Sequence, residues 1–311
     1  MKRFLPALFG VLVVCVSTTV SQICQPCEIP TPVRANRMKA AARANDKAKL
    51  KEEEIVARHF PYGLPQPPSN AANEEMLLQN EWVIWYDSDL RMPLWVAYRF
   101  TKAEAKRKVY PRLDCFRRDP RLSDSDASLC EDYKSSGFDR GHLLPANDAK
   151  RNQAMMDNSF LLSNMAPQLG NFNQKIWMRL ETHVNDWAEE SGVYVVTGAI
   201  FDRNNDRLRD SDDQVARIPP KNRVGRATHF YKIIMHQRPS GVIDTISFLM
   251  PHDNRLFGAN DGRDAYLKTK IASIDDIEEM TGIDFFPNMP AMRQAKIEAG
   301  KATALSKWFT F

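Results

Sequence analysis

The sequence carries two polar segments whose side chains could take part in one reaction. An Asp-Arg-Gly-His run at 139–142 lies within Ser136–Pro145, and we expect its histidine at the exit of a short strand, directly after a turn. About thirty residues later, a second polar run spans Asn173–Glu181. A histidine base, an amide oxygen and a carboxylate are the groups that hydrolysis of a phosphodiester with one metal ion requires. The two segments therefore predict a metal-assisted hydrolytic site.

His142 is the histidine whose surroundings suit a general base. The preceding Gly141 permits backbone geometry that would aim the ring into a cleft. With an ordinary pKa of ~6.5, a neutral imidazole accepts a proton from water near physiological pH. The other five histidines lack this context, and we interpret them as surface or packing residues. They are His59, His183, His229, His236 and His252.

The second run is expected to form a helix over Phe172–Glu189, because apolar residues recur there every three or four positions. In an α-helix, Asn173 and Glu181 would lie ~12 Å apart along the axis and within ~80° of the same face. Direct ligation of one ion by both would be strained. One inner ligand, with the other residue holding a metal-bound water, fits better, and Mg²⁺ favours such oxygen ligands. The alternative is a capped helix with ordinary surface residues.

The N-terminus has the pattern of a signal peptide at residues 1–21. Lys2 and Arg3 precede an apolar run over Phe4–Val16, and small residues follow at 17–21. The apolar run is shorter than the ~20 residues that cross a bilayer. We therefore expect a secreted, extracellular protein without a stable membrane partner. An uncleaved signal that anchors the chain in a membrane is the weaker alternative.

Net charge does not identify a partner for this chain. The chain has 43 basic and 39 acidic side chains, and loss of Lys2 and Arg3 leaves 41 against 39. The distribution is more informative, because residues 99–121 hold nine Lys or Arg. Such a stretch is typical of polyphosphate binding. A solvated surface strand and loop would explain it equally well.

Four cysteines remain after removal of the leader, namely Cys24, Cys27, Cys115 and Cys130. An even number in an exported chain indicates disulfides, and four cysteines allow three pairings. We favour Cys115–Cys130, which would close a short polar loop. Cys24 and Cys27 lie in a Pro-rich tail without βαβ context, so a local or intermolecular bridge is preferred there to a redox motif.

The chain divides into an N-terminal extension with a Pro-rich linker at 22–75 and a folded domain at 76–311. An exposed helix is expected within 36–59, and four prolines at 60–70 indicate the linker. Strands and helices alternate in the domain without a regular βαβ repeat, which favours an α+β fold. Strands are expected at 81–87, 93–101, 192–201, 228–237 and 242–250, and helices at 172–189, 274–281 and 291–305.

The ordered motifs resemble the DNA/RNA non-specific endonuclease family, which includes endonuclease G and has the ββα-metal fold. The resemblance rests on the motifs at 139–142, 163–168 and 173–181, with further similarity at 95–98 and 274–282. It runs from about residue 76 to about residue 286. It implies a central mixed or antiparallel sheet flanked by helices.

The resemblance also implies roles for individual residues. His142 would be the general base, and Asn173 would bind Mg²⁺ directly, with Mn²⁺ as a substitute. Glu181 would position metal-bound water, Asn164 would order the site, and Arg140 would support the phosphate or the hydration shell of the metal. Arg112 is our choice for the upstream phosphate-binding arginine, with Arg117 or Arg118 as alternatives. Asp139 would brace the motif.

These residues predict an endonuclease that hydrolyses DNA and RNA. The resemblance implies 5′-phosphate products, and contacts to phosphates and sugars would leave cleavage without sequence specificity. The resemblance also leaves a homodimer open. The alternative function is a catalytically weak or inactive nuclease-fold protein that captures extracellular nucleic acid.

Overall fold

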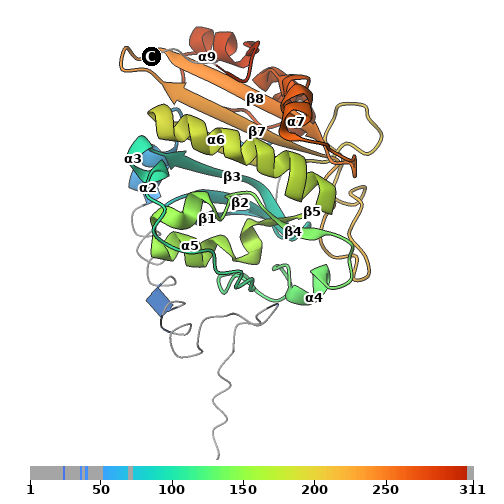
Figure 1. The fold of residues 1–311 in the computed structure, drawn as a ribbon. Helices are drawn as coiled ribbons and strands as arrows, with labels where there is room; N and C mark the ends of the chain where they lie inside the picture. The colour runs from blue at the N-terminus through green and yellow to red at the C-terminus, as the bar shows by residue number, and fades with distance from the viewer. Residues whose placement is uncertain (1–23, 25–35, 37–38, 41–51, 69–72, 307–311) are drawn as a thin grey trace, which may run out of the picture.

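The computed structural model describes residues 24, 36, 39–40, 52–68 and 73–306. Within them, strands and helices combine as the expected α+β fold (Figure 1). The expected signal peptide at 1–21 lies outside the described residues, as does Cys27. None of the helices in the described part of the chain has the length and apolar character of a bilayer span.

The core of the fold is a seven-stranded sheet in which every neighbouring pair of strands is antiparallel. The order is β1-β2-β3-β6-β7-β8-β9, which confirms the expected antiparallel arrangement. The five strands expected from the sequence are all present, and the short edge strands β1 and β9 add to them. The bounds are β1 Glu74–Leu78, β2 Val83–Asp87, β3 Met92–Phe100, β6 Val193–Ile200, β7 His229–Gln237, β8 Ile243–Pro251 and β9 Ile271–Ala272.

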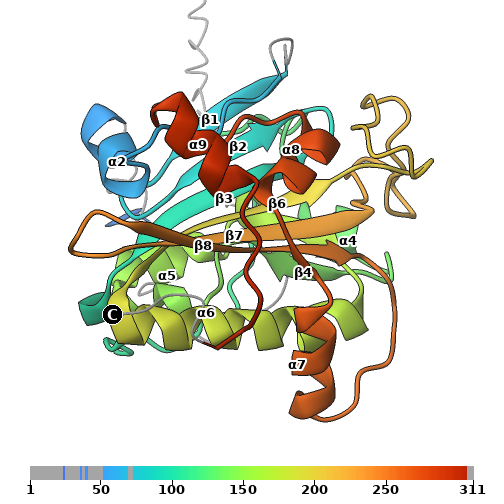
Figure 2. The ribbon, with the colours of Figure 1, turned by 90° about the horizontal axis from the view of Figure 1, so that it is seen from above.

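Helices cover both faces of the sheet. Strand β3 shows the consequence, since eight of its nine residues are buried, whereas a sheet open on one face would alternate. Figure 2 shows α6 and α7 along one face and α2, α8 and α9 on the other. The helices are α2 Glu52–His59, α3 Lys102–Ala105, α4 Cys130–Tyr133, α5 Gln153–Ser159, α6 Met178–Ser191, α7 Asn260–Lys268, α8 Ile274–Thr281 and α9 Ala291–Glu298, with short 3₁₀ turns η1 Asp148–Arg151 and η2 Leu162–Asn164.

Helix α8 begins and ends where its sequence signals indicate. The Ser273 hydroxyl accepts a hydrogen bond from the Asp276 backbone, and Asp276 returns one to the Ser273 backbone. Gly282 ends the helix with a φ of 69°, which glycine adopts without strain. Helix α9 is shorter than the expected 291–305, because it ends at Glu298, two residues before Gly300.

A second, two-stranded sheet lies beside the large one and leads into the longest helix. Strands β4 (Asp139–His142) and β5 (Met165–Gln168) are antiparallel. A π-helical turn, η3 (Phe172–Trp177), then continues directly into α6. The Asp-Arg-Gly-His run is thus itself a strand, and the prediction of a turn before His142 is wrong. Pairing with β5 holds all four of its residues extended.

Part of the segment expected to be an exposed extension and linker packs against the domain. Ile55 and His59 of α2 are buried, and the imidazole of His59 accepts a hydrogen bond from the Arg99 backbone of β3. Farther along, Gln66 forms an antiparallel bridge with Asp284. The Pro-rich segment therefore runs along the domain surface here.

The structure also pairs the cysteines differently from our preference. Cys130, at the start of α4, forms its disulfide with Cys24 across 106 residues of sequence, not with Cys115. The backbone N–H of Cys24 donates to the carbonyl of Phe116 at 2.9 Å. The proximity of Cys115 and Cys130 in sequence suggested a short loop, whereas the fold brings the N-terminal segment to α4.

Candidate active site

The register of β4 and β5 explains the glycine before His142. Gly141 lies opposite Ala166, and a Cβ atom at this position would come within 2.2 Å of the Gln168 side chain. The φ of Gly141 is not in the left-handed region. The glycine is therefore required for close packing and not, as expected from the sequence, for unusual backbone geometry.

The imidazole of His142 lies between two aromatic rings. The Phe116 and Phe160 centroids are 5.6 and 5.0 Å from that of His142, both in edge-to-face geometry. The residue is only 8% exposed, and its Nε2 is buried without a hydrogen-bond partner among the described residues. The expectation of a ring aimed openly into a cleft is therefore wrong for this structure, because aromatic packing encloses the ring.

Burial lowers the pKa of His142 well below its ordinary value of 6.5, and the positive charges of Arg112 and Arg140 lower it further. The ring is consequently neutral at physiological pH, with Nε2 buried as a polar atom without a partner. A neutral imidazole is the form that accepts a proton. The lowered pKa also makes the His142 imidazole a weaker base, unless a bound anion offsets the charge of the two guanidinium groups.

A cavity of about 680 Å³ lies next to this aromatic cluster. Arg140 lies over the Phe116 ring at 4.3 Å, and Arg112 lies over Phe160 at 5.3 Å. Both guanidinium groups thus contact the rings that enclose His142 and also line the cavity. The lining residues are Cys24, Arg112, Phe116, Cys130, Glu131, Tyr133, Lys134, Phe138, Asp139, Arg140, Asn173 and Gln174.

The structure separates the three arginines that were candidates for the phosphate contact. Arg112 lines the cavity, with its Nε 2.7 Å from Asp114. Arg117 is buried elsewhere and donates to the Asp157 carbonyl. Arg118 pairs with Asp124. The basic stretch at 99–121 therefore contributes only Arg112 to the cavity wall.

Asp139 fixes the beginning of the helix that follows β5. Its Oδ2 accepts hydrogen bonds from Asn173 Nδ2 at 2.9 Å and from Gln174 Nε2 at 2.8 Å. Because an ionised carboxylate only accepts, these bonds orient the Asn173 amide and leave its Oδ1 as the available acceptor. No donor to that oxygen occurs among the described residues.

The π-helical turn changes the relation between Asn173 and Glu181. Hydrogen bonds from i to i+5 place more residues in each turn, so the rotation per residue falls below that of an α-helix. The ~80° offset expected for an α-helix therefore becomes smaller. The turn brings the two side chains closer to a common face, which the residue spacing alone did not predict.

Glu181 lies on α6 beside a buried polar network that the sequence did not reveal. Burial raises the pKa of Glu181, while the ammonium of Lys232 acts in the opposite direction. Lys232 is fully buried on β7 and donates to Thr197 Oγ1 at 2.6 Å. Asp148 accepts from the Tyr98 hydroxyl at 2.8 Å. The signal for this network was a single lysine within the otherwise apolar run of β7.

Asn164 supports the backbone and does not line the cavity. Its side chain accepts from the Leu144 N–H and donates to the carbonyls of Leu144 and Ser159, all within 3.0 Å. These bonds use the side chain fully and hold the segment that follows His142 against η2. Its contacts therefore suit an organising role.

The donor groups fit a hard divalent cation that keeps most of its water. The Asn173 Oδ1 is oriented and available, and the Glu181 carboxylate follows on the same helix. Among the described residues, the cavity lining contains no histidine, and its two cysteines, Cys24 and Cys130, form a disulfide, so the lining lacks the ligands that favour zinc. One amide oxygen and one carboxylate match the few protein ligands that Mg²⁺ commonly takes.

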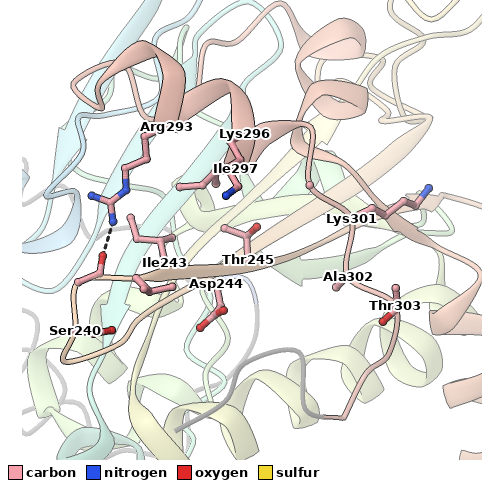
Figure 3. A pocket seen from close by; sticks show the side chains of 13 residues that line it. Ser240, Ile243, Asp244, Thr245, Arg293, Lys296, Ile297, Lys301, Ala302 and Thr303 are labelled. Atoms are coloured by element: carbon pink, nitrogen blue, oxygen red, sulfur yellow. Dashed lines mark hydrogen bonds between the residues drawn. The ribbon is translucent and has the colours of Figure 1, made fainter.

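A second large hollow has a different character. It encloses about 590 Å³ between α9 and the β7–β8 hairpin (Figure 3). Lys296 and Arg293 come from α9, and Arg293 donates to the Gly241 carbonyl. The one carboxylate in its lining, Asp244, accepts hydrogen bonds from Nε and Nη2 of Arg238, each at 2.6 Å. Neither cavity has a histidine in its lining, but Phe116, Arg112 and Arg140 of the first cavity form or contact the rings that enclose His142. That cavity is therefore the better candidate for hydrolysis.

Comparison with known proteins agrees with this geometry. The model of the family described as DNA/RNA non-specific endonuclease matches residues 61–292. Human mitochondrial endonuclease G is 31% identical over 233 residues, covering 74% of this chain and 73% of the relative. Nuclease C1 of Cunninghamella echinulata var. echinulata is 30% identical over 236 residues, covering 75% and 90%. The mitochondrial nuclease of Saccharomyces cerevisiae is 29% identical, covering 76% and 71%.

Proposed function

Because the chain belongs to the DNA/RNA non-specific endonuclease family, with its metal-dependent ββα-metal fold, we propose that it is a secreted, Mg²⁺-dependent endonuclease of DNA and RNA. The carrying observation is the neutral His142 imidazole enclosed by two rings whose neighbours are Arg112 and Arg140. These groups provide a proton acceptor beside two positive charges that suit a phosphate. The members of this site come from the loop before α4, from β4 and from η3.

In the proposed reaction, the two guanidinium groups bind and orient the scissile phosphate. Their charge lowers the pKa of His142, so a phosphate between them would partly restore the basicity of the ring. His142 Nε2 then takes the proton of the attacking water as the water oxygen bonds to phosphorus. Phe116 lines the cavity and contacts the ring, so its side chain must move before water reaches Nε2.

Asn173 and Glu181 would hold the Mg²⁺ ion, Asn173 directly and Glu181 through water. When bound, Mg²⁺ would neutralise charge on the phosphate and stabilise the departing 3′ oxygen, giving 5′-phosphate ends. Asp139 keeps the Asn173 amide oriented for this role. Asn164 holds the backbone after His142. Contacts to phosphate rather than to base edges would leave cleavage without sequence preference.

The test is digestion of plasmid DNA and of RNA by the purified protein with Mg²⁺, with and without EDTA. We expect cleavage that EDTA abolishes, and a roughly 10²- to 10⁴-fold lower rate in His142→Ala, the usual contribution of a general base. His183→Ala is the matched control, since His183 pairs with Asp264 on the surface formed by α6 and α7. Full activity of His142→Ala would refute the assigned base.

The burial of His142 Nε2 favours one second candidate function. In it, the chain is a nuclease-fold protein that binds nucleic acid and cleaves it weakly or not at all. It predicts tight, salt-sensitive binding of a polynucleotide, because phosphate contacts release counterions. Binding of this kind without detectable cleavage in Mg²⁺ or Mn²⁺ would support the second candidate over the first.

The proposal of secretion rests on residues 1–21 and needs its own test. Two of the relatives are named as mitochondrial, so the family does not decide the location. We expect the mature protein in the culture medium of an expressing eukaryotic cell, with an N-terminus near residue 22. Retention in a membrane fraction with the leader intact, or recovery from mitochondria, would contradict this.

A further inference from the structure

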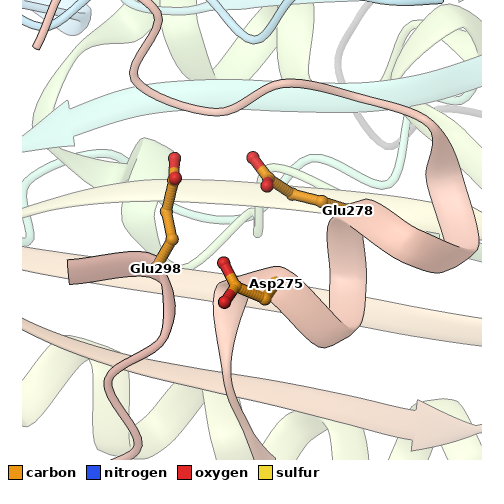
Figure 4. A group of neighbouring side chains, drawn as sticks. All are labelled: Asp275, Glu278 and Glu298. Carbon is orange, nitrogen blue, oxygen red and sulfur yellow. The ribbon is translucent and has the colours of Figure 1, made fainter. Parts of the chain in front are cut away.

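Three carboxylates converge on the side of the molecule that lies across the sheet from α6. Asp275 and Glu278 lie three residues apart on α8, and Glu298 is the last residue of α9. One oxygen from each lies within 4.8 Å of the others (Figure 4). Helices α8 and α9 are on the face opposite to α6, so this cluster is separate from the catalytic cavity (Figure 2).

The burial of Glu298 distinguishes this cluster from ordinary surface carboxylates. Glu298 is only 6% exposed, and its Oε1 is buried without a hydrogen-bond partner among the described residues. An unpaired carboxylate oxygen removed from water is costly, so such a group takes up a proton, pairs with a cation or binds a metal. In Figure 4 the Glu298 side chain points toward the space that it shares with Glu278.

The neighbouring carboxylates on α8 have a cationic partner, which the three carboxylates of the cluster lack among the described residues. Asp276 and Glu279 both form ion pairs with Arg207, at 3.0 and 2.6 Å. By contrast, no Lys or Arg of the described chain lies within 4 Å of a carboxylate oxygen of the cluster. Glu278 receives a single backbone hydrogen bond, from Phe285 at 2.7 Å. The three carboxyl groups therefore have no cationic partner among the described residues.

The ligand chemistry selects among the common cations. All three ligand atoms are carboxylate oxygens. Zinc and copper prefer nitrogen and sulfur ligands, so this set disfavours both metals. Ca²⁺ binds oxygens at 2.3–2.6 Å, so two of its ligands can lie up to ~5 Å apart, whereas the limit for Mg²⁺ is ~4.2 Å. The three oxygens all lie within 4.8 Å of one another, which is inside the range that Ca²⁺ allows. Ca²⁺ also tolerates the irregular geometry that two helices provide.

We propose that Asp275, Glu278 and Glu298 form a structural Ca²⁺ site that joins α8 to α9. Water would complete the coordination on the side of Asp275, the exposed member. Binding would satisfy Glu298 Oε1 and cancel the repulsion between the helices. The ion would take no part in hydrolysis, because the sheet lies between this site and His142. Its effect is on the stability of the C-terminal segment.

The experiment is thermal unfolding of the full chain after EGTA treatment, with Ca²⁺ added back alone. We expect Ca²⁺ to raise the Tm by about 2–4 °C or more, since it binds the folded state preferentially. Glu298→Gln keeps the shape of the side chain and removes one charge, so it should fold and lose most of the Ca²⁺ response. Calorimetric titration of the wild type and of Glu298→Gln with Ca²⁺ measures the binding directly.

Two controls make the result decisive. Glu279→Gln, on the same helix but paired with Arg207, should keep the full response. Asn173→Ala should keep it as well, because that residue belongs to the catalytic cavity. The proposal fails if the wild type shows no Ca²⁺ response, if Glu298→Gln responds like the wild type, or if Asn173→Ala abolishes the response. Folding of each variant is checked by circular dichroism.

Discussion

The catalytic cavity and the acidic cluster of α8 and α9 are opposite in charge but share one feature. Each lies beside or contains a buried polar atom without a partner among the described residues, Nε2 of His142 next to the cavity and Oε1 of Glu298 within the cluster. Around His142 lie two arginines, whereas around Glu298 lie two further carboxylates. The first environment favours an anion and keeps the imidazole neutral. The second favours a cation. The surrounding charge therefore indicates which kind of ligand each atom would bind.

Among the tests of this comparison, the largest effect is expected for the charges beside His142. Arg140→Gln should lower kcat/KM for DNA about 10- to 100-fold, because a charge-assisted hydrogen bond to phosphate is worth about 1.5–3 kcal/mol. Steady-state cleavage of a defined duplex measures this. Arg118→Gln, which changes an arginine away from the cavity, should stay close to the wild-type value. Equal losses in both variants would show that overall charge, and not the cavity, binds the phosphate.

A smaller effect is expected in the pH dependence of cleavage. His142 must be neutral to act as a base, and its pKa is lowered by burial and then by Arg112 and Arg140. Activity should therefore persist below pH 6.5 and fall only as the pH drops through the lowered pKa. Arg112→Gln removes one cause, so its acid limb should move to higher pH. If the pH–rate profiles of kcat/KM are identical for the wild type and Arg112→Gln, the proposed effect of Arg112 on the pKa of His142 is contradicted.

The smallest effect is expected at the acidic cluster in the absence of Ca²⁺. Burial, followed by neighbouring carboxylates that include Asp275 and Asp284, raises the pKa of Glu278 and of Glu298 to about 7 from an ordinary value of 4.5. The folded state thus holds protons that the unfolded state releases. The resulting stability is fully present below pH 4.5 and is lost as the pH rises through about 7.

Thermal unfolding in EGTA between pH 5 and pH 8 would detect this loss. Glu298→Gln should show a weaker decline in Tm over that range than the wild type, because one of the two coupled protons is absent. The Tm of Glu279→Gln should decline over this pH range as much as that of the wild type. An unchanged slope in Glu298→Gln would show that folding does not raise the pKa of Glu298.

Much of the large sheet could be predicted from the sequence, because strand formation depends on local residue type. Runs such as 229–237 and 243–251 are rich in β-branched and aromatic residues, which favour an extended chain. Helix α8 was predictable for a similar reason, since Ser273 and Gly282 mark its ends through contacts within a few residues. The edge strand at 74–78 was missed, because it adjoins the proline-rich segment and its sequence is short.

The sequence proposes the residue types of the candidate site but does not predict their surroundings. The motif identified His142, Asn173 and Glu181, yet the aromatic enclosure of His142 depends on Phe116 and Phe160, which are distant from it in sequence. The Lys232 network and the Cys24–Cys130 disulfide likewise join segments far apart along the chain. Such contacts follow from the packing of strands and helices and leave no local pattern.

The sequence by itself determined the α+β class, the family and the residue types of the candidate site, because these depend on residue type and short-range spacing. Only the tertiary structure decided which arginine lines the cavity, that the imidazole is enclosed, and that three carboxylates meet between α8 and α9. Charge and burial act over a few ångströms in space, and the chain reaches those distances only when it is folded.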